Sequence, residues 1–141
     1  GISKKISSLV LLAPLADDTD EINISLQKSH NTTISEFLNR DDNSFIKINF
    51  LNCNNATVKI SSFLSYYNLP RDEQLIPMLK DIDIDTYVFT ASEDIFVPKT
   101  HSKVSYIKNN NIKLVQIDGA DHFFRDLFLD DIVDNLSDFI E

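Results

Sequence analysis

Residues 86–117 read TYVFTASEDIFVPKTHSKVSYIKNNNIKLVQI, and this stretch decides the fold class. It begins and ends with a short apolar run rich in branched residues, 86–91 and 112–117, and each run is bounded by polar residues typical of turns. Between the runs, Val104 and Ile107 stand at helical spacing within 99–108. A strand, a helix and a second strand joined by short turns favour a parallel pair with a crossover helix. We therefore predict an α/β fold.

Two flanking segments extend this prediction to a three-layer arrangement. Residues 6–12, ISSLVLL, form another apolar run that ends just before Pro14, which is the pattern of a strand buried on both faces of a parallel sheet. A helix is predicted over 124–140, with an apolar face formed by Leu127, Phe128, Ile132, Leu136, Phe139 and Ile140. The expected sheet thus has strands near 6–12, 86–91 and 112–117, and helices flank it.

The middle of the chain, 17–80, contains no strand that clearly belongs to this sheet. Candidate helices lie at 33–39, 56–67 and 71–79, separated by polar turns. We expect one domain over 1–141, with 17–80 as a helical, cap-like insertion above the sheet. The acidic residues that open the insertion lack the glycine and the ligand spacing of a calcium loop, so they are interpreted as a solvated loop; they are Asp17, Asp18, Asp20 and Glu21.

Composition excludes several classes of function. The chain has 22 acidic and 13 basic side chains, a net charge of −9, and its basic residues do not cluster, so we expect no nucleic-acid partner. A single cysteine, Cys53, allows no internal disulfide and favours a reducing, cytoplasmic location. The apolar runs are too short to span a membrane, and no targeting signal is visible. The chain has two glycines, Gly1 and Gly119, too far apart for any dinucleotide, phosphate-loop or G-x-S-x-G motif.

Polar residues follow two of the predicted strands, at the sheet edge where ligands of parallel α/β folds bind. Asp94 follows 86–91, and His122 follows 112–117 just after Gly119, the single internal glycine. Neighbouring strands lie about 4.8 Å apart, so a carboxylate after one can hydrogen-bond an imidazole after the next. Such a carboxylate fixes the imidazole tautomer and leaves the other ring nitrogen to act as a general base. Asp94 and His122 are therefore the candidate catalytic residues.

Other polar residues receive structural interpretations. Asp121 and Arg125 are spaced to form an ion pair rather than a substrate contact. His30 and His101 have no Cys or His at ligand spacing, so they are expected to be surface histidines, and no metal or cofactor is predicted. For Asp94 and His122 taken singly, a turn residue and a loop histidine are the alternatives.

The motifs together carry a resemblance to a known family. TASEDIFVP at 90–98 and GADHFF at 119–124 resemble the acid and histidine motifs of the α/β-hydrolase family, and SLVLLAPLAD at 8–17 is similar to its sixth strand. The resemblance implies the C-terminal half of a serine hydrolase: strand six, a cap, then strands seven and eight with their helices. It also implies a small-molecule carboxylic ester as substrate, Asp94 as the acid of the triad and His122 as its base.

The chain departs from the family pattern at the nucleophile. In the family the serine lies on an elbow upstream of strand six; here Ser3 follows Gly1, but Lys5 stands where the second glycine would be. We expect Ser3 not to be a nucleophile and the chain alone to be inactive. The alternative is a non-catalytic binding or assembly module with the same fold. In either case, strand 6–12 is expected to mediate self-association or association with a missing N-terminal half.

Overall fold

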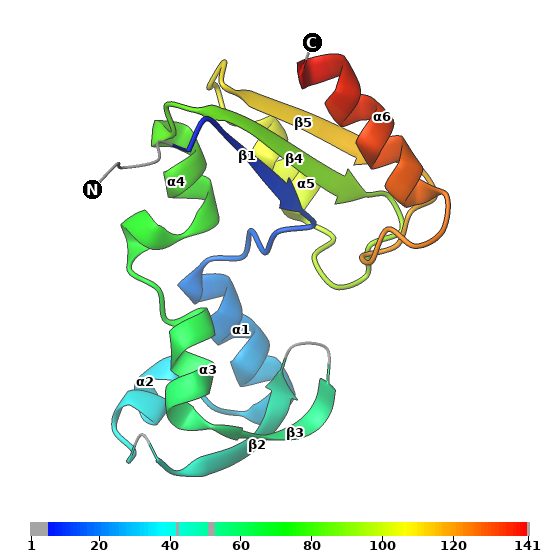
Figure 1. The fold of residues 1–141 in the computed structure, drawn as a ribbon. Helices are drawn as coiled ribbons and strands as arrows, with labels where there is room; N and C mark the ends of the chain where they lie inside the picture. The colour runs from blue at the N-terminus through cyan, green and yellow to red at the C-terminus, as the bar shows by residue number, and fades with distance from the viewer. Residues whose placement is uncertain (1–5, 42, 51–52, 141) are drawn as a thin grey trace, which may run out of the picture. The chain divides into compact units, whose positions relative to one another are not determined.

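The computed structural model describes residues 6–41, 43–50 and 53–140, with side chains up to 137. The chain divides into two compact units (Figure 1). The sheet unit comprises 1–16 and 75–141, and the hairpin unit comprises 17–74, which is most of the segment predicted as an insertion. The elements of the sheet unit are β1 (Ser8–Leu12), α4 (Leu75–Asp81), β4 (Asp85–Ala91), α5 (Thr100–Ser105), β5 (Ile112–Ile117) and α6 (Phe128–Ile140).

The sheet unit confirms the predicted α/β fold class. Its three strands are parallel, in the order β1-β4-β5. The register pairs Leu12 with Phe89 across β1 and β4, and Ala91 with Ile117 across β4 and β5. The carboxyl ends of β4 and β5 therefore lie side by side, so the loops that follow them start from one edge of the sheet.

Helices cover both faces of this sheet, because successive side chains of a strand point to opposite faces. Tyr87 and Phe89 of β4 pack with Ile132 of α6 on one face. Val88 lies between them in sequence and packs with the buried side chains of α4 and α5 on the other face. Figure 1 shows α6 and α5 on opposite sides of the sheet. Among the described residues, no helix combines the length and apolarity needed to cross a membrane.

Strand β1 was predicted to be buried on both faces, and that prediction is wrong. Within the described residues, β1 pairs with β4 alone and is an edge strand, as expected for a strand that would mediate association. Its exposure alternates, with Val10 41% and Leu12 48% exposed, whereas Val88 and Phe89 in the central strand are fully buried. Leu11 packs with the buried side chains of α4 and α5 on one face, whereas Val10 and Leu12 point to the other face and are not part of the cluster formed with α6. The apolar run is typical of a parallel strand, but the helices that pack over each face decide how much of it is buried.

The predicted helix over 124–140 begins later than expected, at Phe128. Phe124 and Asp126 have φ of 47° and 59°, in the left-handed region that a right-handed helix cannot contain. Leu127, assigned to the buried face, is therefore outside the helix and 76% exposed. Ile132 is buried and Leu136 packs beside it, as predicted, while the side chains of 139 and 140 lie outside the described residues.

The hairpin unit differs most from the sequence-based expectation. It contains an antiparallel pair of strands as well as helices, and the part of the predicted helix 56–67 before Ile60 belongs to a strand. The alternation of buried Ile46 and Ile48 with exposed Lys47 is the period of a half-buried strand. The elements are α1 (Thr19–His30), α2 (Ile34–Leu38), β2 (Phe45–Phe50), β3 (Cys53–Lys59), α3 (Ile60–Tyr67) and the 3₁₀ turn η1 (Arg71–Glu73).

The acidic residues at the start of this unit were predicted to form a solvated loop, and that prediction is wrong. Asp18, Asp20 and Glu21 form the beginning of helix α1. The Asp18 carboxylate accepts a hydrogen bond from the Glu21 backbone N–H at 2.9 Å, and the Glu21 carboxylate accepts one from the Asp18 N–H at 3.1 Å. This reciprocal pair is a capping box, which satisfies two backbone donors that a helix start otherwise leaves open. Asp20 and Glu21 also lie in the first turn, where the helix dipole favours negative charge.

Candidate active site

Besides the contact between the two candidate residues, hydrogen bonds that involve the backbone join the loops after β4 and β5 to each other. The Ser92 N–H donates to the Ile117 carbonyl at 3.1 Å, and the Glu93 N–H donates to the Ala120 carbonyl at 2.9 Å. The Gly119 N–H donates to Ser92 Oγ at 2.7 Å. The loops that carry the two candidate catalytic residues therefore form one rigid edge, built on the parallel register beneath it.

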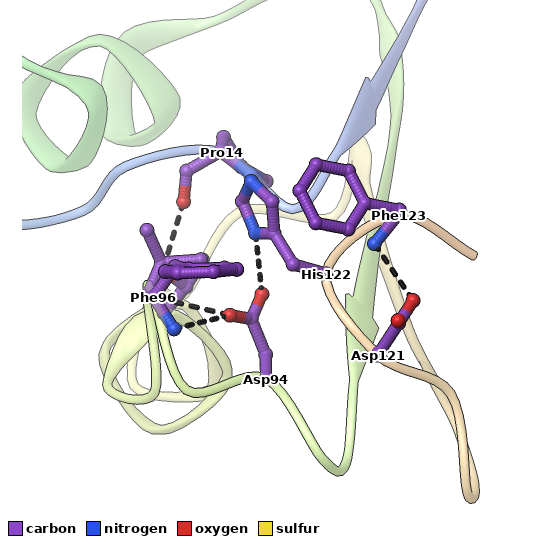
Figure 2. A network of polar contacts seen from close by, with 8 residues as sticks. Pro14, Asp94, Phe96, Asp121, His122 and Phe123 are labelled. Carbon is purple, nitrogen blue, oxygen red and sulfur yellow. Dashed lines mark hydrogen bonds and ion pairs between the residues drawn. The ribbon is translucent and has the colours of Figure 1, made fainter. Parts of the chain in front are cut away.

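Hydrogen bonds from two backbone N–H groups and from His122 hold the Asp94 side chain in this edge. Its side chain is 4% exposed, and Oδ1 accepts hydrogen bonds from the backbone N–H groups of Phe96 at 2.8 Å and Val97 at 3.0 Å. Oδ2 lies 2.8 Å from Nδ1 of His122 (Figure 2). Three donors therefore fix the carboxylate plane, and one oxygen is directed at the imidazole.

His122 is the more exposed member of the pair, with 22% of its side chain exposed. Because an ionised carboxylate can only accept, the short contact requires a proton on Nδ1, so in the neutral ring Nε2 is the nitrogen that carries the lone pair of a base. Within the described residues, Nε2 makes no hydrogen bond. The contact predicted between Asp94 and His122 is thus present, and the ring nitrogen that would act as a base is free to meet another group.

Two aromatic side chains flank the imidazole, and sequence reasoning did not identify them. The rings of Phe96 and Phe123 each lie 5.2 Å from the His122 ring, centroid to centroid, both edge to face (Figure 2). They also contact each other at 5.8 Å. Their positions beside Asp94 and His122 in sequence were the available signal. These rings restrict the orientation of the imidazole and surround it with apolar surface.

The segment around His122 contains strained backbone. Phe124 and Asp126 have positive φ, as does Gly119 at 75°. For a bulky residue such as Phe124, which is buried, this conformation is a rare outlier that only surrounding structure can maintain. Such a conformation costs about 1–3 kcal/mol and persists only where the surrounding contacts over-determine it.

Asp121 and Arg125 form the predicted ion pair beside the site. Asp121 Oδ2 lies 2.6 Å from Arg125 Nη2 and accepts from Nε at 3.0 Å. Desolvation raises the pKa of the Asp121 carboxyl, but hydrogen bonds from Arg125 and from the Phe123 N–H, together with the Arg125 charge, lower the pKa below its ordinary value of 3.8. The guanidinium also lies 5.2 Å from the centre of the Phe123 ring. The pair therefore links the two ends of the short segment that contains His122.

A small cavity lies beneath the site, next to Asp94. Its volume is about 70 Å³, and its lining includes Thr90, His101 and Gln116. A drug-sized ligand needs several hundred Å³, so this cavity is too small to hold a substrate.

The two histidines expected at the surface are each half-buried and take part in hydrogen bonds. His101 Nδ1 lies 2.9 Å from the Thr90 hydroxyl, and His30 Nε2 accepts from the Asn49 N–H at 3.1 Å. No group of three or more His, Cys, Asp or Glu side chains in the described part of the chain is arranged to hold a metal ion. Cys53 is exposed.

Comparison of the sequence with protein-family models and with curated proteins found no match. A functional conclusion for this chain therefore depends on the geometry of the site.

Proposed function

We propose that the sheet unit supplies the acid and the histidine of a Ser-His-Asp triad in a cytoplasmic serine hydrolase of the α/β-hydrolase type, acting on carboxylic esters. The observation that carries the proposal is the 2.8 Å contact between a buried carboxylate and His122 Nδ1, with Nε2 unbonded within the described residues. In this arrangement the carboxylate orients the ring and stabilises the imidazolium that forms when Nε2 takes a proton.

The reaction needs two parts besides this pair. A serine hydroxyl must come within about 3 Å of Nε2 so that it can lose its proton as it attacks the ester carbonyl. Two N–H donors must stabilise the oxyanion that results. Within the described residues, no hydroxyl hydrogen-bonds His122. The proposal therefore assigns the serine to a segment other than residues 1–141, and it places the ester over the exposed side of the imidazole.

The test is ester hydrolysis by this chain expressed together with the coding sequence immediately upstream of it. We expect turnover of a p-nitrophenyl ester, a fall of about 10⁴-fold in kcat for Asp94→Asn, and a loss at least as large for His122→Gln. Glu93→Gln is the matched control, because Glu93 is an exposed acid adjacent to Asp94 in the same turn. Full activity of the Asp94 and His122 variants would overturn the proposal.

The purified chain alone should not hydrolyse the ester. Ser3, which was not expected to be a nucleophile, lies outside the described residues. Hydrolysis by the chain alone that disappears with Ser3→Ala would contradict the assignment of the serine to another segment.

A role in assembly is the second candidate, and the exposed strand β1 favours it. β1 is uncharged and pairs with β4 on one side only, and Ile6 just before it is 69% exposed, beside exposed Val10 and Leu12. An apolar edge of this kind pairs readily with another strand. The candidate function is a non-catalytic module that self-associates, or binds another segment of its protein, through 6–12.

Sedimentation of the purified chain tests this second candidate. We expect a dimer at high micromolar concentration, and a folded monomer for Val10→Lys, since a charge in the middle of the strand would be desolvated by pairing. Val133→Lys is the control, because Val133 is 52% exposed but lies on α6 rather than on the strand edge. A folded monomer for the unmodified chain would rule out self-association.

A further inference from the structure

The hairpin unit has an open strand edge of its own. In an antiparallel pair, alternate residues exchange both backbone hydrogen bonds with the partner, and the residues between them direct N–H and C=O outward. The Ile60 N–H donates to the Ser44 carbonyl at 3.0 Å, which sets this alternation. The register of 45 with 59 and 47 with 57 then makes Phe45 and Lys47 outward-directed residues on β2.

One outward group of this edge already has a partner. The Asn49 N–H donates to His30 Nε2 at 3.1 Å, so the C-terminal end of α1 covers the far end of β2. Within the described residues, the outward backbone groups of Phe45 and Lys47 have no such partner. The outer edge of β2 is therefore hydrogen-bonded at Asn49, and its backbone groups at Phe45 and Lys47 are available to another strand.

A groove of about 420 Å³ runs beside this open edge, between β2 and the segment that joins α1 to α2 and continues past α2. Phe45 forms part of its wall and is 65% exposed, while Ile46 and Ile48 are buried at its base. The volume is in the range of pockets that bind ligands the size of a short peptide segment.

The groove carries positive charge in a chain whose net charge is −9. Arg40 and Lys47 both line it, both are exposed, and neither side chain has a hydrogen-bond or ion-pair partner within the described residues. The acid in the lining is Glu36, whose Oε2 accepts a hydrogen bond from the Thr32 hydroxyl at 2.6 Å. The lining therefore carries two positive charges, on Arg40 and Lys47, against one negative charge on Glu36, and its balance is positive.

We infer that this groove binds an extended acidic peptide segment, which adds to the β2–β3 hairpin as a third strand alongside β2. The outward N–H and C=O groups of Phe45 and Lys47 supply the main-chain hydrogen bonds, as in other strand-addition complexes. Alternate side chains of an added strand face the same side, so acidic residues at every second position can share the exposed face of β2 with Lys47, while the Arg40 side chain lines the same groove.

The probe is a fluorescently labelled, end-blocked peptide of alternating aspartate and valine, five residues long, titrated with the purified chain and followed by anisotropy. We expect saturable binding, weakened about tenfold by Arg40→Glu or Lys47→Glu and weakened by added salt. Both side chains are exposed, so these variants should fold, and circular dichroism checks that they do. Lys28→Glu is the matched control, an exposed charge reversal on α1 outside the groove lining, and it should bind as the unmodified chain does.

Further peptides separate strand addition from simple anion binding. Two peptides carry N-methyl groups on alternate peptide bonds, each peptide on a different set, so each lacks the N–H donors along one of its edges. The peptide that lacks the donors facing β2 should not bind, and the other peptide should bind. A peptide with lysine in place of aspartate should not bind. Equal binding of both N-methylated peptides would overturn the inference, and so would no binding at millimolar peptide. Displacement of the peptide from the unmodified chain by inorganic phosphate, at a concentration that displaces no peptide from Lys47→Glu, would also overturn it.

Discussion

The Asp94 carboxylate should be the side chain on which the β4–α5 loop depends most. It is almost fully buried and accepts from two backbone N–H groups and from His122. Asp94→Ala leaves all three donors without this acceptor. Each lost hydrogen bond destabilises by about 1 kcal/mol, and a buried donor left unpaired costs more, so we expect a loss of about 3 kcal/mol in the free energy of unfolding.

Asp94→Asn provides the internal comparison. The asparagine carbonyl oxygen can still accept from the N–H groups of Phe96 and Val97, so only the contact with His122 is lost or inverted. We expect a cost of about 1 kcal/mol, the value of one hydrogen bond. The difference between the two substitutions then measures what the backbone contacts contribute to the loop.

Native-state hydrogen exchange is the appropriate assay, because the chain has two compact units and a single unfolding transition cannot be assumed. The amides of β4 are buried in the centre of the sheet, so their protection reports on the sheet unit alone. Glu93→Ala is the control, as an exposed neighbour whose removal should change stability by less than about 0.5 kcal/mol. Equal protection in Asp94→Ala and the unmodified chain would refute the reasoning.

Three further outcomes follow from the sheet unit. The pKa of Asp121 is lowered in the folded state, so its contribution to stability is present above the ordinary carboxyl range and is lost as pH falls through the folded pKa. Arg125→Gln should therefore reduce stability near neutral pH and have no effect in strong acid. Thermal melts at both pH values test this, and a difference between the variant and the unmodified chain that persisted in strong acid would contradict it. Gly119→Ala should cost about 1 kcal/mol in urea denaturation, because the added Cβ meets only ordinary contacts at 3.5 Å and the φ of 75° is the source of strain; a neutral result would mean the loop relaxes. Ile132→Ala should cost about 3 kcal/mol by the same method, while Val133→Ala, on the exposed face of the same helix, should be nearly neutral, and similar values for both would place the core elsewhere.

The hairpin unit shows where sequence patterns mislead. The apolar residues of β3 and α3 follow one another without a glycine or proline between them, so 56–67 has the composition of one helix. Val58 is buried with Ile46 of the opposite strand, whereas Ile60 and Phe63 are buried on the helix that follows. A strand forms here because β2 is available as a partner, and the β-branched Thr57 and Val58 suit a paired strand.

The sequence by itself determined the parallel α/β arrangement and the meeting of Asp94 with His122, because both follow from local rules. Apolar runs at β4 and β5 separated by a helix favour parallel strands, and polar residues after parallel strands meet at one edge. Tertiary structure alone decided the exposure of β1, the late start of α6 after the strained residues 124 and 126, and the two rings around the imidazole. These features depend on which segments from distant parts of the chain become neighbours, and no local pattern of side chains encodes the number of neighbours that a strand, a loop or a ring acquires.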